Sequence, residues 1–178
     1  MEDERDLNIV LVGLDPSFVS AVARQLAQSF DMYFLDSMEL YKFDILPLTL
    51  GFVLRRYGID YFREKQTDTI KYVASFSNTV ITVESGALLY QENLDIINRD
   101  GLIVYLKQNE NYLYKKLTNA DYFSKEEYNF YCLSKRELIE RDFCLSNVAE
   151  ITSDVTGFSV KDCVNEIILK IEKYYGVK

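Results

Sequence analysis

The stretch that most constrains the fold runs from residue 8 to residue 27. Residues 8–13 read Asn-Ile-Val-Leu-Val-Gly, and such a continuous apolar run is typical of a strand covered on both faces. Asp15 is a good helix N-cap, and Pro16 suits the first helical position. The sequence therefore predicts a buried strand, a tight turn at Gly13 and a helix that begins at Pro16.

This strand–turn–helix is also the frame of a phosphate-binding loop with the pattern G-x-x-x-x-G-K-[ST]. When the pattern is placed on Gly13, its final hydroxyl falls on Ser20. Phe18 stands where the second glycine belongs, and Val19 stands where the phosphate-binding lysine belongs. The chain thus keeps the frame of the loop but lacks its central glycine and its cation.

Two other residues of the loop also oppose phosphate binding. Asp15 places a negative charge where an anion would bind, and its cap would use N–H groups that a phosphate needs. Pro16 removes one backbone donor. We expect magnesium-ATP to bind weakly or not at all. Two interpretations remain open, an ordinary capped helix and an atypical nucleotide site.

Apolar runs alternate with helical patterns along the rest of the chain. Further strands are expected at 32–36, 79–83, 102–106 and 148–152. Helices are expected over 37–57 in two pieces broken near Pro47, over 59–76, after residue 86, over 109–118, over 134–146 and from Ser159 onward. This alternation predicts an α/β fold, with a five-stranded parallel sheet, strand one in its centre and helices on both faces.

Composition narrows the class of protein. A length of 178 residues favours one domain over 1–178, and a net charge of -8 argues against nucleic-acid binding. No signal peptide and no run long enough to cross a membrane is evident. Three cysteines without a C-x-x-C pair favour reduced thiols and a cytoplasmic protein. The absence of histidine leaves any catalysis to carboxylates, lysine, tyrosine or an oxygen-bound metal.

Ligands of parallel sheets bind beyond the carboxyl ends of the strands, where this chain places charged residues. Asp36 and Glu84 follow neighbouring strands, so they could hold a divalent cation, provide a general base or remain solvated acids. Arg63 and Arg141 could bind a carboxylate ligand or pair within the protein, with Glu84 as the expected partner.

The order and spacing of these features resemble the shikimate kinase family over roughly residues 8–175. The similar segments are the loop Gly13–Ser20, Asp36-Ser37-Met38 in place of Asp-x-Asp, Gly58-Ile-Asp-Tyr-Phe-Arg63, the turn Glu84-Ser85-Gly86-Ala87, Glu92-Asn93-Leu94 before the strand at 102–106, and Glu140-Arg141. The resemblance implies a P-loop kinase fold, a three-layer sandwich with strand order 2-3-1-4-5. It also implies transfer of the γ-phosphate of ATP to a hydroxyl of shikimate, with magnesium.

The resemblance assigns roles to individual positions. Gly13 and Ser20 are the cofactor-binding positions, and Ser20 and Asp36 are the metal positions. Asp36 is also the catalytic position if the protein is active. The substrate-binding positions are Arg63, Glu84, Gly86 and Arg141. Residues 118–133 correspond to the lid. They contain no arginine to match the lid arginine of the family, and Lys125 is their only cation. Departures from the family pattern are Phe18, Val19, Met38, Glu84 and Ser85.

Two functions follow from this comparison of positions. The first is a shikimate-kinase-like pseudoenzyme with a degenerate phosphate loop, which binds a small anionic metabolite or a protein partner and needs no cofactor. The alternative is an active ATP- and magnesium-dependent kinase with an atypical site. Either way, we expect Glu84 to pair with Arg63 or Arg141 and to take the place of a substrate carboxylate.

Overall fold

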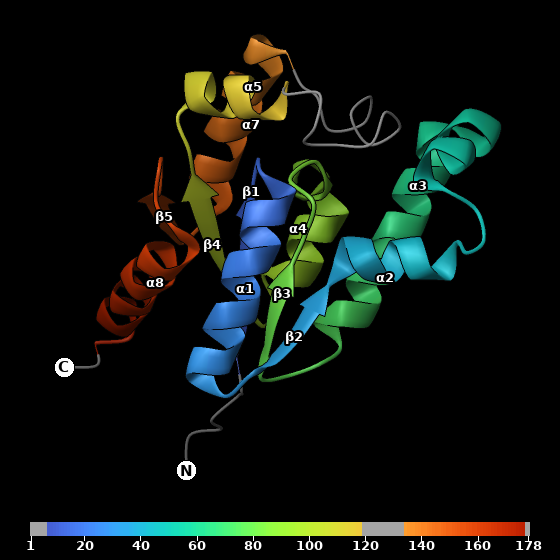
Figure 1. Ribbon diagram of the computed structural model, residues 1–178. Coiled ribbons are helices and arrows are strands. Elements are labelled where there is room, and N and C mark those ends of the chain that lie inside the picture. The colour runs from blue at the N-terminus through green and yellow to red at the C-terminus, as the bar shows by residue number, and fades with distance from the viewer. Residues whose placement is uncertain (1–6, 119–133, 177–178) are drawn as a thin grey trace.

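The computed structural model describes residues 7–118 and 134–176 of the chain. Its centre is one parallel sheet of five strands in the order β2-β3-β1-β4-β5 (Figure 1). The strands are β1 (Asn8–Gly13), β2 (Tyr33–Asp36), β3 (Thr79–Thr82), β4 (Gly101–Lys107) and β5 (Ile151–Asp154). The predicted fold class, parallel pairing and central first strand are therefore confirmed.

The first strand is central because β1 pairs with β3 on one side and with β4 on the other. All six of its residues are buried, as its apolar sequence predicts. The carboxyl ends of the strands lie together at one edge of the sheet. This edge carries the turn after β1, the start of α2 after β2 and the turn after β3, so it brings together residues that are far apart in the sequence.

Helices cover both faces of the sheet (Figure 1). One core lies under α1 and α8, and the other lies under α3, α4, α5 and α7. The helix bounds are α1 (Pro16–Phe30), α2 (Ser37–Asp44), α3 (Leu50–Ala74), α4 (Gln91–Ile97), α5 (Glu110–Leu117), α7 (Lys135–Val148) and α8 (Val160–Tyr174), with a 3₁₀ turn η1 (Ala87–Leu89). The arrangement is the three-layer sandwich of the P-loop kinase fold.

Helix α1 begins as predicted. Asp15 has an extended backbone, its side chain accepts the N–H of Phe18, and Pro16 occupies the first helical turn. The expected break between a helix that ends at 57 and a helix that starts at 59 is confirmed, because α3 is kinked at Gly58. Gly58 marks the junction with a φ of 85°, a conformation that glycine adopts without a side-chain clash.

The expected strand at 148–152 is displaced. Helix α7 continues to Val148, and β5 starts at Ile151 and runs to Asp154. Helical hydrogen bonding persists to the C-cap Ala149, whose N–H reaches the carbonyl of Leu145, and this leaves Val148 outside the sheet. Of the expected lid segment 118–133, residues 119–133 lie outside the described part of the chain.

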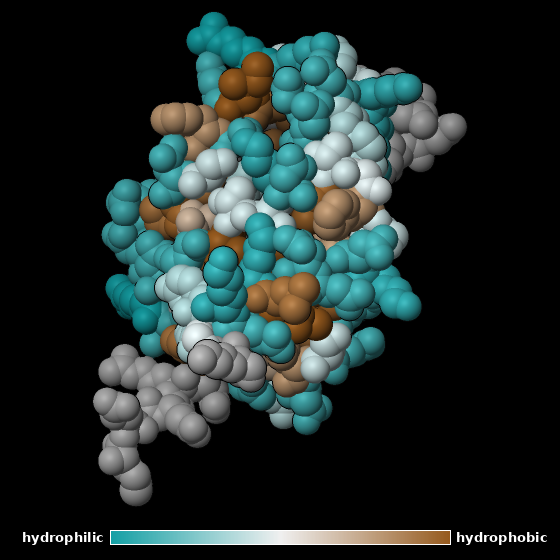
Figure 2. All heavy atoms as spheres, turned by 90° about the vertical axis from the view of Figure 1, so that its left-hand side faces the viewer, coloured by the Kyte–Doolittle hydropathy of each residue, from teal (hydrophilic) through white to brown (hydrophobic). Residues whose placement is uncertain are grey.

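No helix within the described ranges is both long and apolar enough to cross a bilayer. Figure 2 views the side of the molecule that carries α8 and β5. Hydrophilic side chains cover most of this face, and the hydrophobic ones form separate spots between them. Isolated exposed apolar side chains such as Phe143 and Leu169 are ordinary on a protein surface.

Candidate functional site

The turn after β1 places an internal carboxylate at the start of α1. Asp15 is buried, and its Oδ1 accepts the N–H of Phe18 at 3.2 Å. Its Oδ2 lies 2.5 Å from the Nζ of Lys116, which reaches over from α5. A negative charge next to the positive end of the helix and next to an ammonium group is electrostatically favourable. The N-terminus of α1 thus carries an internal carboxylate that is paired with Lys116.

The position of the loop lysine is apolar. Val19 is buried and packs so closely that a Cβ on Gly13 would lie 2.6 Å from its Cγ2. Gly13 therefore permits the close approach of α1 to β1. The Lys116 ammonium lies near this region, but it comes from a different helix and forms an ion pair with Asp15.

Ser20 and Asp36, the two expected metal positions, are in direct contact. The hydroxyl of Ser20 donates to Oδ2 of Asp36. Oδ1 of Asp36 accepts the N–H groups of Met38 and Glu39, so this side chain is also the N-cap of α2. No cluster of three or more acidic, cysteine or histidine side chains that could hold a metal exists within the described residues.

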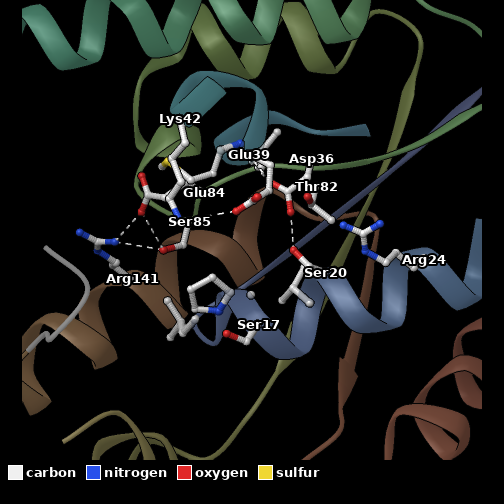
Figure 3. A pocket seen from close by; sticks show the side chains of 16 residues that line it. Ser17, Ser20, Arg24, Asp36, Glu39, Lys42, Thr82, Glu84, Ser85 and Arg141 are labelled. Carbon is white, nitrogen blue, oxygen red and sulfur yellow. Dashed lines mark hydrogen bonds and ion pairs between the residues drawn. The ribbon is translucent and has the colours of Figure 1, made fainter. Parts of the chain in front are cut away.

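The turn after β3 holds a buried carboxylate between Arg63 and Arg141. Figure 3 shows the contact of this carboxylate with Arg141. Glu84 Oε2 accepts from Arg63 at 3.0 Å and from the Gln66 amide at 3.2 Å. Its Oε1 accepts from Arg141 at 3.2 Å and from the Gly86 N–H at 2.8 Å. The predicted pairing of Glu84 is confirmed, and it involves both arginines instead of one.

The electrostatics of Glu84 follow from this environment. Burial alone would raise the pKa of its carboxyl group. The positive charges of Arg63 and Arg141 and the N–H of Gly86 outweigh burial and lower this pKa below its ordinary value. Glu84 is therefore ionised at neutral pH. A Cβ on Gly86 would lie about 3 Å from the Glu84 carboxylate, so the absence of a side chain there makes room for the network.

A cavity of about 260 Å³ lies next to these groups at the carboxyl edge of the sheet. It brings together the turn after β1, the start of α1, α2, the end of β3 and Arg141 of α7. Of the expected site residues, Gly13, Ser20, Asp36, Glu84 and Arg141 line it. Arg63 and Gly86 do not line it, but both donate hydrogen bonds to Glu84.

Four residues at or beside this site were missed at the sequence level. Gln66 follows Arg63 by three residues on α3, a helical spacing that could have indicated its approach to Glu84. Arg24 follows Ser20 by one helical turn, and Thr82 is the last residue of β3. Lys116 gave no signal, because 101 residues separate it from Asp15.

The parallel sheet with the order 2-3-1-4-5, and a loop between β1 and α1 at its edge, define the class of P-loop kinase-like proteins. The sequence model of the family described as Shikimate kinase matches residues 20–172. The chain belongs to the shikimate kinase family. The match begins at Ser20, so the loop residues before it lie outside the matched part.

Individual relatives agree with this assignment. The chain is 30% identical to a shikimate kinase of Clostridium botulinum over 115 residues, 65% of this chain and 67% of that protein. It is 24% identical to the shikimate kinase of Thermodesulfovibrio yellowstonii over 169 residues, 93% of this chain and 95% of that protein.

Solved structures show the same fold. The structure of shikimate kinase from Acinetobacter baumannii in complex with shikimate superimposes with a TM-score of 0.80 at 22% identity, covering 94% of both chains. Shikimate kinase from Aquifex aeolicus gives a TM-score of 0.79 at 20% identity, covering 97% of this chain and 100% of that one.

Proposed function

We propose that this protein is a shikimate-kinase-like binding protein, which takes up a small anionic metabolite and lacks efficient phosphotransfer. The observation that carries the proposal is the position of Glu84. Its carboxylate lies between Arg63 and Arg141, the pair that the family resemblance assigns to the carboxylate of the substrate. The internal carboxylate of Glu84 therefore competes with an external carboxylate for these two guanidiniums.

The loop also argues against a bound nucleotide. ATP phosphates need successive free N–H groups and a cation, whereas Asp15 occupies the N–H of Phe18 and Val19 supplies no charge. The residues present therefore do not fit a triphosphate as this loop is arranged, and we derive no reaction step through ATP. Ser20 and Asp36 have the oxygen ligands that Mg²⁺ prefers, and they would hold it if the alternative function applied.

The remaining cavity supports an anionic ligand of small size. Its volume of about 260 Å³ is below the range of roughly 300–1,000 Å³ that is usual for drug-sized ligands. Arg24 and Lys42 line it in addition to Arg141, so cationic groups remain at its wall.

The alternative is an active ATP-dependent small-molecule kinase. Two observations favour it: the named relatives are shikimate kinases, and the ammonium group of Lys116 lies beside the loop. For this function, Lys116 would have to leave Asp15 and bind phosphate in the place of the missing lysine. The family's cofactors, ATP and magnesium, would then be required.

One experiment separates the two functions. Calorimetry with shikimate, ADP and magnesium-ATP, together with a coupled phosphotransfer assay, would be run beside the Clostridium botulinum shikimate kinase as the positive control. We expect no turnover and no nucleotide affinity in the micromolar range for this chain. Turnover of shikimate would establish the alternative. The double variant Phe18→Gly with Val19→Lys is expected to remain inactive, because Asp15 and Pro16 still occupy the loop.

A further inference from the structure

One wall of the cavity is formed by the face of the sheet that α1 covers. Thr82 is aligned with Leu11 of β1 and with Asp36 of β2. Side chains alternate between the two faces of a strand, and Val80 of β3 packs into the core under α1. Thr82 therefore points to the α1 side as well, where it lines the cavity.

The hydroxyl of Thr82 has an unusual environment. The residue is only 4% exposed, yet Oγ1 has no hydrogen-bond partner among residues 7–118 and 134–176. Buried hydroxyl groups are normally paired, because leaving one unpaired is energetically unfavourable. Because Thr82 also lines the cavity, a polar group of a bound ligand could supply the missing hydrogen bond.

A cation lies on the opposite side of the same space. Arg24 is one helical turn beyond Ser20 on α1, and its guanidinium carbon lies 4.6 Å from the centre of the Phe34 ring. In Figure 3 its guanidinium extends from α1 toward Thr82 and Asp36. It forms no ion pair within the described part of the chain, although it lines the cavity.

The other charged groups at the cavity are already in use. Arg141 donates to Glu84 and to Ser85, and Lys42 lies 3.5 Å from Glu39. Asp36 accepts three hydrogen bonds, from two backbone N–H groups and from Ser20, which spread its charge. Among the described residues that line the cavity, Arg24 is thus the cation that forms no ion pair with a carboxylate.

We propose that Arg24 and Thr82 form a subsite for a small hydroxy acid. The guanidinium of Arg24 binds the carboxylate of the ligand, because its planar donors match two carboxylate oxygens. The ligand hydroxyl pairs with Oγ1 of Thr82. The ligand therefore sits against α1 and away from the arginine pair that Glu84 occupies. This inference rests on the proposed function, since it specifies where and how the bound anion is recognised.

The test uses two acids that differ by one hydroxyl group, L-malate and succinate. Each is titrated into the full chain, and binding is followed by NMR shifts of backbone amides. We expect saturable shifts around Arg24 and Thr82, not around Arg63, with tighter binding of malate. Loss of a charge-assisted hydrogen bond lowers binding affinity by a factor of about ten to one hundred. Arg24→Gln should therefore weaken the binding of both acids by that factor.

The variants at Thr82 isolate the hydroxyl contact. Thr82→Val should bind malate no better than succinate, and Thr82→Ser should restore the preference for malate. Arg136→Gln is the matched control, since Arg136 is an exposed arginine on α7 that pairs with Glu140, and it should leave both affinities unchanged. Thermal melting of each variant verifies folding.

The results of these titrations support or overturn the subsite without deciding whether the protein transfers phosphate. No saturable shift with either acid, equal affinities for Arg24→Gln and the unaltered chain, or shifts centred on Arg63 and Arg141 would each overturn it. These results leave the phosphotransfer assay unaffected. Conversely, turnover of shikimate would overturn the proposed function, while the malate titration would still report on Arg24 and Thr82.

Discussion

Glu84 is the site residue whose substitution should destabilise the fold most. Its side chain is 4% exposed and holds two guanidiniums, an amide and a backbone N–H. Removing one partner of a buried ion pair leaves uncompensated charge, so Glu84→Ala should lower the free energy of unfolding by about 3–5 kcal/mol. Urea denaturation measures this loss.

The control for this variant is Glu92→Ala, which breaks an exposed pair with Lys71. Exposed pairs contribute little, so the urea midpoint of this control should stay close to that of the unaltered chain. Equal losses for the two variants would contradict the view that Glu84 is buried and fully paired.

The charge of Glu84 also predicts a pH dependence. Its pKa is lower in the folded protein than its ordinary value of 4.5, because the two arginines outweigh the effect of burial. Such a group stabilises the fold at pH values above 4.5, and its contribution disappears as the pH falls through the folded pKa.

Comparison with Glu84→Gln isolates this effect. The difference in unfolding free energy between the two proteins should be largest above pH 4.5 and shrink below it. Denaturation curves on either side of this pH measure the difference. A difference in unfolding free energy that grows as the pH falls would contradict the lowered pKa of Glu84.

Single residues were predictable where local rules apply. Asp15 was identified as a helix cap from its place before Pro16, and Glu84 as a partner of arginine from the cost of an unpaired buried charge. The contact of Lys116 with Asp15 was not predictable, because it depends on how α5 lies over the turn after β1. The unpaired hydroxyl of Thr82 likewise depends on packing, since its sequence position only indicates a buried strand.

Among the helices, α7 is held against the sheet by a polar contact next to Arg141. Asp142 accepts from the hydroxyl of Tyr105 at 2.8 Å and from Lys107 at 2.8 Å, both on β4. Burial, followed by the hydrogen bond to Asp142, raises the pKa of Tyr105 far above its usual range. This contact fixes the turn of α7 that carries Arg141.

Asp142→Ala should leave the buried Tyr105 hydroxyl without its acceptor and lower the free energy of unfolding by about 1–3 kcal/mol. Adding Tyr105→Phe removes the unpaired group, so the double variant should recover part of the loss. A double-mutant cycle from urea denaturation measures this coupling. Strictly additive losses would indicate that the two side chains do not interact.

The pairing of Asp15 with Lys116 at the start of α1 can also be tested by substitution. Asparagine caps helices about as well as aspartate, so Asp15→Asn should keep the helix while it removes the negative charge beside Lys116. Inorganic phosphate should then raise the melting temperature of this variant more than that of the unaltered chain.

Lys116 should be essential to this phosphate response. Adding Lys116→Gln to Asp15→Asn removes the cation and should abolish the extra stabilisation. If phosphate stabilises the unaltered chain as strongly as Asp15→Asn, the carboxylate does not block the anion position.

The elements themselves were largely predictable, because periodicity and caps are local signals. The apolar run of β1 and the N-cap of α1 were placed correctly. The boundary between α7 and β5 was not, because Val148 suits the end of a helix as well as a strand, and only tertiary packing decides between them. The break in α3 at Gly58, by contrast, was placed correctly, and glycine adopts the positive φ found there without a side-chain clash.

Across the sheet, protection from hydrogen exchange should follow strand position. β1 and β4 are paired on both sides and buried, whereas β2 is an edge strand whose first residue, Tyr33, is 73% exposed. Amides of 8–13 and 101–107 should therefore exchange most slowly, and those of β2 faster. Hydrogen exchange followed by mass spectrometry measures the order of these exchange rates. Fastest exchange in β1 would contradict the central position of that strand.

The buried carboxylates at the carboxyl edge of the sheet would compete with any external acid for the same cationic groups. Asp15 and Glu84 link the turns after β1 and β3 to helices α5, α3 and α7. A tethered group acts at an effective concentration of about millimolar or more. A free acid below that threshold cannot displace Glu84 through its carboxylate alone. Under the proposed function, an external acid would therefore need a high concentration or additional contacts to reach the arginine pair.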